Sequence, residues 1–234
     1  MADLYRGTAP LPPDAAYRVA KTSARPVTLL PGHDRAWQSA QRIEWGPAKY
    51  RTSFRALWNG QGLAVRFEAC DDRPWHTMTR IDDPIWEEEV VEIFIDPACL
   101  GRHYAEVEIS PGNGVTDLHI LEPHPRLNGD RSWNWRGLES TVVPGSCGGL
   151  SPGSWVALAW LPWSGLQSMA PEVAPRVPPA PGDAWQFNVF RIKRPHGPAE
   201  RERDAIYAAW SPPEGPSFHE PAAFRRMEFS PDRG

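Results

Sequence analysis

The sequence predicts an all-β protein, an antiparallel β-sandwich of two packed sheets with Pro-rich loops between its strands. Short runs of alternating polar and apolar residues recur along the chain, and Gly, Pro and Asn separate them. No segment of useful length has the apolar period of an amphipathic helix. The 27 prolines also disfavour long helices, since proline interrupts them. A helical turn is expected at 162–166 alone.

The clearest strand pair covers residues 52–58 and 63–69. Each run places apolar residues at every second position, and Asn59-Gly60 lies between them. An Asn-Gly between two alternating runs is the strongest local signal for a β-hairpin. Further strands are predicted at 90–96, 104–110, 115–120, 137–143, 155–160, 185–192, 207–210 and 224–229.

One domain is predicted over residues 36–234. Residues 1–35 are rich in proline and are expected to form a lead-in that wraps this domain. The Pro-rich segment 170–182 is interpreted as a surface loop and not as a domain boundary, because strand patterns continue after it.

The charge and hydropathy of the chain exclude several kinds of partner. A net charge of −4 and a pI near 6.0 provide no general attraction for nucleic acid or anionic membranes. No apolar run reaches the length of a membrane span. Neither nucleic acid nor a membrane is therefore expected as a partner.

The N-terminus and the cysteines together predict a cytoplasmic location. Residues 1–13 contain no apolar core of a secretory signal. Cys70, Cys99 and Cys147 are odd in number and lack metal-binding spacing, so reduced, buried thiols are expected.

A group of glutamates is the first candidate site. Glu92 interrupts the apolar strand 90–96, and a carboxylate there must face water, a partner or a ligand. Glu106 and Glu108 share one face of the next strand. If the two strands pair, the three carboxylates converge, and they could bind sugar hydroxyls, hold calcium or act as an acid/base pair. The simpler interpretation leaves the glutamates solvated, with Trp86 covering the core.

Aromatic and basic side chains add to this candidate site. Twelve tryptophans exceed what a core of this size needs, which leaves some indoles for stacking on ligands. Trp75 is a candidate for the rim of the site. Trp133 and Trp135 are interpreted first as core and second as another stacking surface. Arg191 is expected to be solvated or to meet the acidic patch across the sheet.

In several segments the chain resembles carbohydrate-binding module family 9, over about residues 36–229. The segments are the hairpin before Cys70, "VEIFID" at 91–96 after a tryptophan, "WVALAWLPWSGL" at 155–166, "GDAWQFNVFR" at 182–191 and the closing segment from 209. The resemblance implies a β-sandwich found as an accessory module of xylan-degrading enzymes. Such modules clamp a sugar ring, typically at a chain end, between two tryptophans.

The resemblance also implies roles for individual residues. Trp86 matches the first clamp residue, and Glu92 matches the strand glutamate that bonds sugar hydroxyls. The second clamp position, eight residues after the core Trp210, is occupied by Phe218. Phenylalanine offers a smaller stacking face and no indole N–H.

Three further positions depart from the family pattern. Where the family uses an amide and a basic residue against the sugar, this chain has Glu106 and Glu108. An asparagine of the last loop is replaced by Gly215. These changes would suit a different sugar, an amino sugar or a bound cation.

The function predicted from the sequence is non-catalytic binding of a small sugar or a polysaccharide chain end, linked to xylan breakdown. Trp86, Phe218, Glu92, Glu106, Glu108 and Arg191 form the predicted site. No cofactor is required, and calcium is a candidate ion.

Two other functions are alternatives. A hydrolase of O-glycosyl bonds would use Glu92 with Glu106 or Glu108 as acid and base. A haem-binding sandwich, a remoter alternative, would pair Met78 with a histidine. A metal site at His103, His119 and His124 is disfavoured by their spacing.

Overall fold

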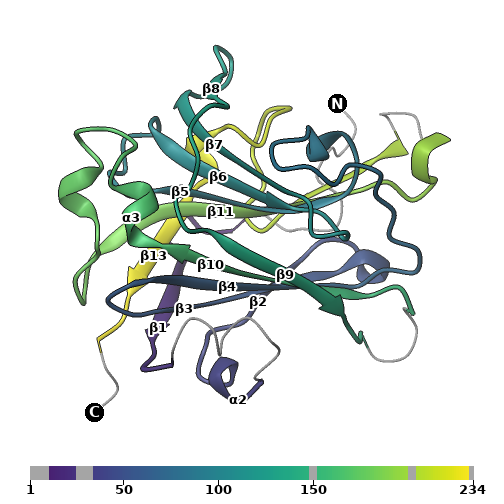
Figure 1. Ribbon diagram of the computed structural model, residues 1–234, viewed down its shortest axis with the longest axis horizontal. Helices are drawn as coiled ribbons and strands as arrows, with labels where there is room; N and C mark the ends of the chain where they lie inside the picture. The colour runs from purple at the N-terminus through teal and green to yellow at the C-terminus, as the bar shows by residue number, and fades with distance from the viewer. Residues whose placement is uncertain (1–10, 25–33, 148–151, 200–203, 232–234) are drawn as a thin grey trace.

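The computed structural model describes residues 11–24, 34–147, 152–199 and 204–231, which are built almost wholly from strands (Figure 1). The all-β prediction is confirmed. In chain order the strands are β1 (Ala16–Lys21), β2 (Ile43–Trp45), β3 (Thr52–Trp58), β4 (Gly62–Ala69), β5 (Val90–Asp96), β6 (Tyr104–Ile109), β7 (Val115–Glu122), β8 (Asn128–Asp130), β9 (Glu139–Pro144), β10 (Trp155–Pro162), β11 (Ala184–Lys193), β12 (Ile206–Ala209) and β13 (Arg225–Phe229).

The helical segments are short. The expected helical turn is present as α3 (Trp163–Leu166), and α2 (Asp34–Trp37) is a second one. Single 3₁₀ turns are η1 (Ala48–Tyr50), η2 (Ile85–Glu87), η3 (Ala174–Arg176), η4 (Gly197–Ala199) and η6 (Pro221–Ala223). Among the described residues, no helix is long and apolar enough to cross a membrane.

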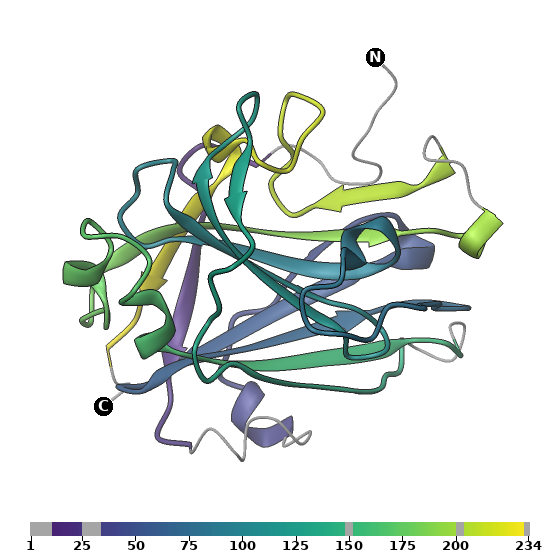
Figure 2. The ribbon, with the colours of Figure 1, turned by 45° about the horizontal axis from the view of Figure 1, so that its top comes forward.

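The strands form one hydrogen-bonded path in the order β8-β7-β6-β5-β11-β13-β1-β3-β4-β10-β9, with β12 beside β11 and β2 beside β3. Most neighbours are antiparallel, but β1 is parallel to both β13 and β3. Because β1 joins the two halves, the predicted division into two separate sheets is not confirmed. The half with β5, β6, β7 and β11 lies over the half with β3, β4, β9 and β10 (Figures 1 and 2).

The main hydrophobic core lies between these halves. Val91, Ile93 and Ile95 of β5 belong to the same buried cluster as Phe54 of β3 and Phe67 of β4. Trp133 and Trp135 are also in this cluster, which confirms their interpretation as core residues.

The other face of the β5-β6-β11 half carries a second buried cluster. Phe94 of β5, Tyr104 of β6 and Phe190 of β11 pack there with Phe218 and Phe224 from the closing segment. Successive side chains of a strand point to opposite faces, so the residues between the core residues of β5 necessarily point here. Glu92 is one of them.

The predicted lead-in contains a strand that the sequence analysis did not identify. In β1, Tyr17 and Val19 are fully buried, and the Tyr17 hydroxyl donates to the Gln41 carbonyl at 2.8 Å. Residues 1–10 and 25–33 of the lead-in lie outside the described part of the chain. The lead-in therefore contributes a strand to the centre of the sheet.

Cys70 and Cys147 form a disulfide, so the prediction of reduced thiols is wrong for this pair. The register explains their proximity, because Ala69 of β4 and Pro144 of β9 both pair with Trp155 of β10. The cysteines that follow these positions have Cα atoms 5.5 Å apart, which suits a disulfide. Cys99 is free and exposed.

Candidate functional site

A cavity of about 450 Å³ lies on the face of the second hydrophobic cluster. Its lining includes Trp86, Glu92, Glu106, Glu108 and Phe218, five of the six residues predicted for the site. They come from η2, β5, β6 and the segment before η6. The fold thus brings together residues that are widely separated in the sequence.

The three glutamates converge because β5 and β6 pair in a fixed register. Glu92 lies opposite Glu108, and Glu106 lies opposite Phe94, so all three side chains share one face of the sheet. One carboxylate oxygen of each lies within 4.8 Å of the others, and each of the three residues is at least 96 % buried. The predicted convergence is confirmed, but the carboxylates are buried and not solvated.

Burial raises the pKa of each of these carboxyl groups. For Glu92 and Glu108 the pKa lies well above its usual range because desolvation disfavours the charged form and Glu106 adds repulsion. Burial raises the pKa of Glu106 to about 7, opposed by a hydrogen bond with Glu108. Glu92 Oε1 and Glu108 Oε2 have no hydrogen-bond partner among the described residues.

The raised pKa of Glu106 predicts that stability falls as pH rises. From about pH 4.5 to 7 the folded protein retains a proton that the unfolded chain releases, so the free energy of unfolding decreases across this window. Glu106→Gln is expected to make this decrease smaller, since Glu92 and Glu108 still titrate with raised pKa values, and to stabilise the protein at pH 7.5 by up to about 3 kcal/mol. Urea unfolding at several pH values measures the effect.

The prediction would be refuted if the unfolding free energy of Glu106→Gln varied with pH in parallel with that of the wild type. Glu139→Gln, the same substitution at an exposed residue of β9, is the control.

Trp86 and Phe218 form aromatic walls of the cavity in different ways. Trp86 is half-buried, and the guanidinium of Arg131 lies 5.0 Å from its ring centroid. Phe218 is only 9 % exposed and stacks on Phe190, with the ring centroids 4.2 Å apart. One face of Phe218 is therefore covered by the protein, and its ring has less free surface than a projecting clamp residue.

His219 is a cavity residue that the sequence analysis missed. Its Nε2 atom lies 3.8 Å from Glu106 Oε2, and its Nδ1 atom is 2.9 Å from the Tyr104 hydroxyl. Burial, with a smaller contribution from His124, lowers the pKa of His219 to about 4, so the ring is neutral at neutral pH. Arg131 and Tyr207 were also missed; nothing in the local sequence links them to the glutamates.

Arg191 does not line the cavity, which corrects its expected position. Its neighbour Phe190 pairs with Glu92, so alternation points Arg191 to the opposite face of β11. There its guanidinium is buried and bonds Asp71 Oδ2 at 2.6 Å, together with the carbonyls of Tyr50 and Cys70.

The other predicted candidates lie apart from this site. Trp75 does not line the cavity; its indole N–H donates to the Arg194 carbonyl at 3.2 Å. His103 Nδ1 lies 3.2 Å from His119 Nε2. Among the described residues, however, only the three glutamates form a group of His, Cys, Asp or Glu side chains close enough to share one cation.

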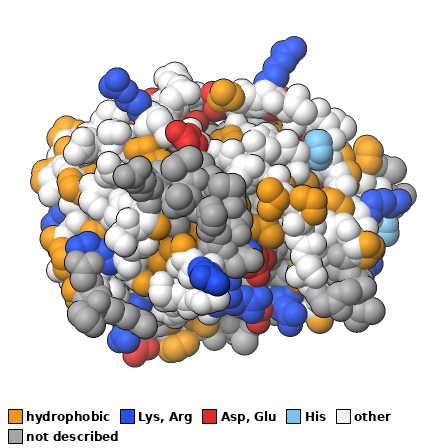
Figure 3. Space-filling model, turned by 60° about the horizontal axis from the view of Figure 1, so that its bottom comes forward, with side chains coloured by type: hydrophobic (Ala, Val, Ile, Leu, Met, Phe, Trp, Pro, Cys, Tyr) orange, Lys and Arg blue, Asp and Glu red, His pale blue; other side chains and the backbone are white. Residues whose placement is uncertain are grey.

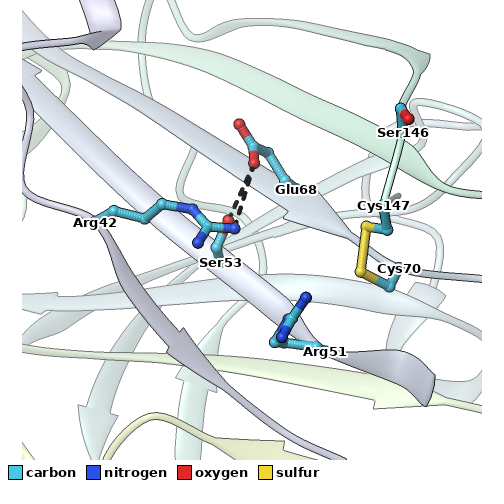
Figure 4. A pocket seen from close by; sticks show the side chains of 7 residues that line it. All are labelled: Arg42, Arg51, Ser53, Glu68, Cys70, Ser146 and Cys147. Carbon is cyan, nitrogen blue, oxygen red and sulfur yellow. Dashed lines mark hydrogen bonds and ion pairs between the residues drawn. A yellow bond between two sulfur atoms is a disulfide. The ribbon is translucent and has the colours of Figure 1, made fainter. Parts of the chain in front are cut away.

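A second cavity, of about 260 Å³, lies beside the disulfide (Figure 4). Arg42, Arg51, Ser53 and Glu68 line it with the two cysteines. Glu68 accepts from Ser53 Oγ at 3.3 Å and lies 3.7 Å from Arg42 Nη2. Arg42 and Arg51 both also pair with Glu44, so the charges are largely balanced within the protein. Basic and acidic side chains likewise adjoin one another on the face in Figure 3.

Comparison with solved structures reveals the fold type. A candidate carbohydrate-binding protein of Bacteroides uniformis matches with a TM-score of 0.70 and 15 % identity, covering 96 % of this chain and all of that one. A family 9 carbohydrate-binding module of Caldicellulosiruptor kristjanssonii in complex with cellotriose matches with a TM-score of 0.64 and 13 % identity, covering 94 % and 95 % of the two chains. The chain has the fold of a family 9 carbohydrate-binding module.

One further solved structure has the same fold, and one curated protein is related in sequence. The same Caldicellulosiruptor module in complex with glucose matches with a TM-score of 0.63 and 13 % identity, over 94 % and 97 % of the chains. No family model matches the sequence. An "Extracellular protein" of Arthroderma benhamiae is 26 % identical over 190 residues, covering 76 % of this chain and 78 % of the relative.

The expected cytoplasmic location is wrong. The curated relative is named an extracellular protein, and the disulfide between Cys70 and Cys147 is of a kind that persists in oxidising compartments. The sequence analysis failed here because the odd number of cysteines concealed one bonded pair and one free thiol.

Proposed function

We propose that this family 9-type domain is a non-catalytic carbohydrate-binding domain whose ligand occupies the cavity beside Trp86. The observation that carries the proposal is that one cavity is lined both by two aromatic side chains, Trp86 and Phe218, and by three buried carboxyl groups. Sugar rings have apolar C–H faces that stack on aromatic rings and hydroxyl edges that need hydrogen-bond partners. In this proposal the halves on either side of β1 act as the layers of a sandwich, with the site outside one layer.

Each part of the cavity has a separate role in binding. The half-buried indole of Trp86 stacks on the sugar ring, while Phe218, backed by Phe190, is a fixed wall that limits where the ring can lie. Glu92 and Glu108 orient the sugar through their unpartnered oxygens. A carboxylate accepts from a sugar hydroxyl, and a protonated carboxyl group also donates to one, so the raised pKa values widen the range of hydroxyl contacts.

The ligand class follows from the cavity and its structural neighbours. A volume of about 450 Å³ suits one or two sugar rings, such as a free sugar or the end of a chain. Neighbours bind glucose and cellotriose, so gluco-configured sugars are tested first, followed by xylose and xylobiose for a link to xylan. The domain acts outside the cell in this proposal, in keeping with the extracellular relative.

Removing the Trp86 side chain tests the proposal. Isothermal titration of the wild type with glucose, cellotriose and xylobiose is expected to give saturable heat with dissociation constants on the order of micromolar to millimolar. Trp86→Ala is expected to weaken binding about tenfold or more, because stacking and apolar contact are lost.

A matched variant distinguishes stacking from a general loss of structure. Trp75→Ala makes the same substitution at a half-buried tryptophan outside the cavity and is expected to leave affinity unchanged. Equal affinities of Trp86→Ala and the wild type, or no binding of any sugar by the folded wild type, would reject the proposal.

The arrangement of the carboxyl groups favours binding over hydrolysis. Glycosidases place two carboxyl groups on opposite sides of the scissile bond. Here the three groups gather on one face of the β5–β6 pair, with oxygens within 4.8 Å of one another. Sugars recovered after the titration are therefore expected to be unchanged, as chromatography of the incubated oligosaccharides would demonstrate.

A further inference from the structure

The charge of the sugar-binding cavity is not balanced within the protein. Among the described residues that line it, the only basic side chains are Arg131 and His219. Arg131 is exposed; it lies against Trp86 and donates to the Asp82 carbonyl at 2.9 Å. His219 is neutral at neutral pH because burial lowers its pKa to about 4. Arg131 acts on Glu108 and lowers its pKa, but no buried cation among the described lining residues offsets the three carboxyl groups. Their pKa values are therefore raised, and a cation bound beside them would favour their charged form.

A buried cluster elsewhere in the protein pairs its carboxylates with cations. Asp71 bonds Arg191 at 2.6 Å and Lys193 at 2.8 Å, and Lys193 also bonds Glu89 at 2.7 Å. In the cavity, Glu92 Oε1 and Glu108 Oε2 are buried and have no partner in the described chain, and unlike Asp71 and Glu89 these two residues have no ion pair with a lysine or arginine among the described residues. These two oxygens belong to residues that line the cavity, so a ligand in the cavity is the natural source of the missing donors and of the missing positive charge.

The carboxylates lie close enough together to share one ammonium group. Three acceptors at about 2.8 Å from one tetrahedral nitrogen lie about 4.6 Å from one another. The carboxylate oxygens of Glu92, Glu106 and Glu108 lie within 4.8 Å of one another, one acceptor for each of the three N–H donors. The neighbouring rings of Trp86 and Phe218 also attract cations through their faces.

We propose that the cavity selects an amino sugar, with the sugar ring beside Trp86 and its ammonium group on Glu92, Glu106 and Glu108. This inference rests on the proposed sugar-binding function and names its ligand class. A neutral sugar supplies hydroxyl donors but no charge, and an N-acetylated sugar supplies one N–H and no charge. A calcium ion supplies charge but needs six to eight oxygen ligands, and the apolar and aromatic walls of this cavity contribute few.

Titration with three sugars of the same ring configuration tests this selectivity. The wild type is titrated at about pH 7 with glucosamine, glucose and N-acetylglucosamine, because the sugar amine is still largely protonated there and Glu106, whose pKa burial raises to about 7, is about half ionised. Glucosamine is expected to bind roughly tenfold to a hundredfold more tightly than either neutral sugar, because charge-assisted hydrogen bonds are stronger than neutral ones. In the double variant Glu92→Gln/Glu108→Gln the ratio of the glucosamine affinity to the glucose affinity is expected to fall to about one, whatever the change in absolute affinity, because the glutamine amides carry no charge. Glu139→Gln, the same substitution at an exposed residue of β9 that does not line the cavity, is the matched control and keeps the preference.

Each other outcome has a distinct meaning. Glucose binding as tight as glucosamine binding would overturn the amino-sugar inference and leave the sugar-binding proposal intact. Absence of binding by all three sugars, with cellotriose and xylobiose also inactive, would overturn both. A glucosamine preference that survives in a folded Glu92→Gln/Glu108→Gln variant would place the amine elsewhere and overturn the inference. Saturable calcium binding that excludes glucosamine would also overturn it, because the carboxylates would then serve a metal ion.

Discussion

Asp71→Ala is expected to lower the free energy of unfolding by about 3–5 kcal/mol, which urea denaturation would measure. Asp71 is fully buried and bonds both Arg191, at 2.6 Å, and Lys193, at 2.8 Å. Lys193 keeps Glu89 as a partner in the variant, but the buried guanidinium of Arg191 loses its carboxylate. A buried charge without a counter-charge is costly, so the loss exceeds that of an ordinary ion pair.

The adjacent Asp72 provides the control for this prediction. Asp72 pairs with Lys49 at 2.8 Å, but the two side chains are 43 % and 61 % exposed. Exposed ion pairs contribute at most about 1 kcal/mol, so Asp72→Ala is expected to have a small effect. Equal losses for Asp71→Ala and Asp72→Ala would contradict the role assigned to burial.

Replacing both Cys70 and Cys147 with serine is expected to lower the free energy of unfolding by about 2–4 kcal/mol. The disulfide closes a loop between residues 77 positions apart, and cross-linking such a long segment restricts the unfolded chain strongly. It also joins the ends of β4 and β9, which are not neighbours in the sheet because β10 lies between them. Urea unfolding of the double variant, and of the wild type under reducing conditions, measures the effect.

Cys99→Ser is the control that distinguishes loss of the disulfide from the effect of replacing any cysteine with serine. Cys99 is free and exposed, so its substitution is expected to change stability by less than about 0.5 kcal/mol. Wild-type protein that is equally stable in oxidising and reducing conditions would contradict the prediction for the disulfide.

Strands with strong alternation were predicted well from the sequence. The predicted strands 52–58 and 90–96 have the bounds of β3 and β5, and 104–110 differs from β6 by one residue. The missed strands are β1, β2 and β8. Two of them have three residues each, too few for alternation to be recognised, and β1 lies in a Pro-rich segment.

The candidate site was also predicted in part, because alternation along a strand determines which of its side chains share a face. Alternation along β5 and β6 placed Glu92, Glu106 and Glu108 on one face, and the family resemblance added Trp86 and Phe218. Their burial was not predictable, because it depends on the cover formed by β12 and the closing segment, whose position no local pattern encodes. His219 was missed for the same reason.

By itself the sequence determined which side chains share a face of each strand, since the two-residue period of an extended backbone is a local property. The tertiary structure alone decided what each face meets. The parallel pairing of β1 with both β13 and β3, the disulfide from Cys70 to Cys147 and the position of Arg191 beside Asp71 all join distant segments. Such contacts form because the whole core is buried at once, so their energy comes from many residues together and no single segment of sequence specifies them.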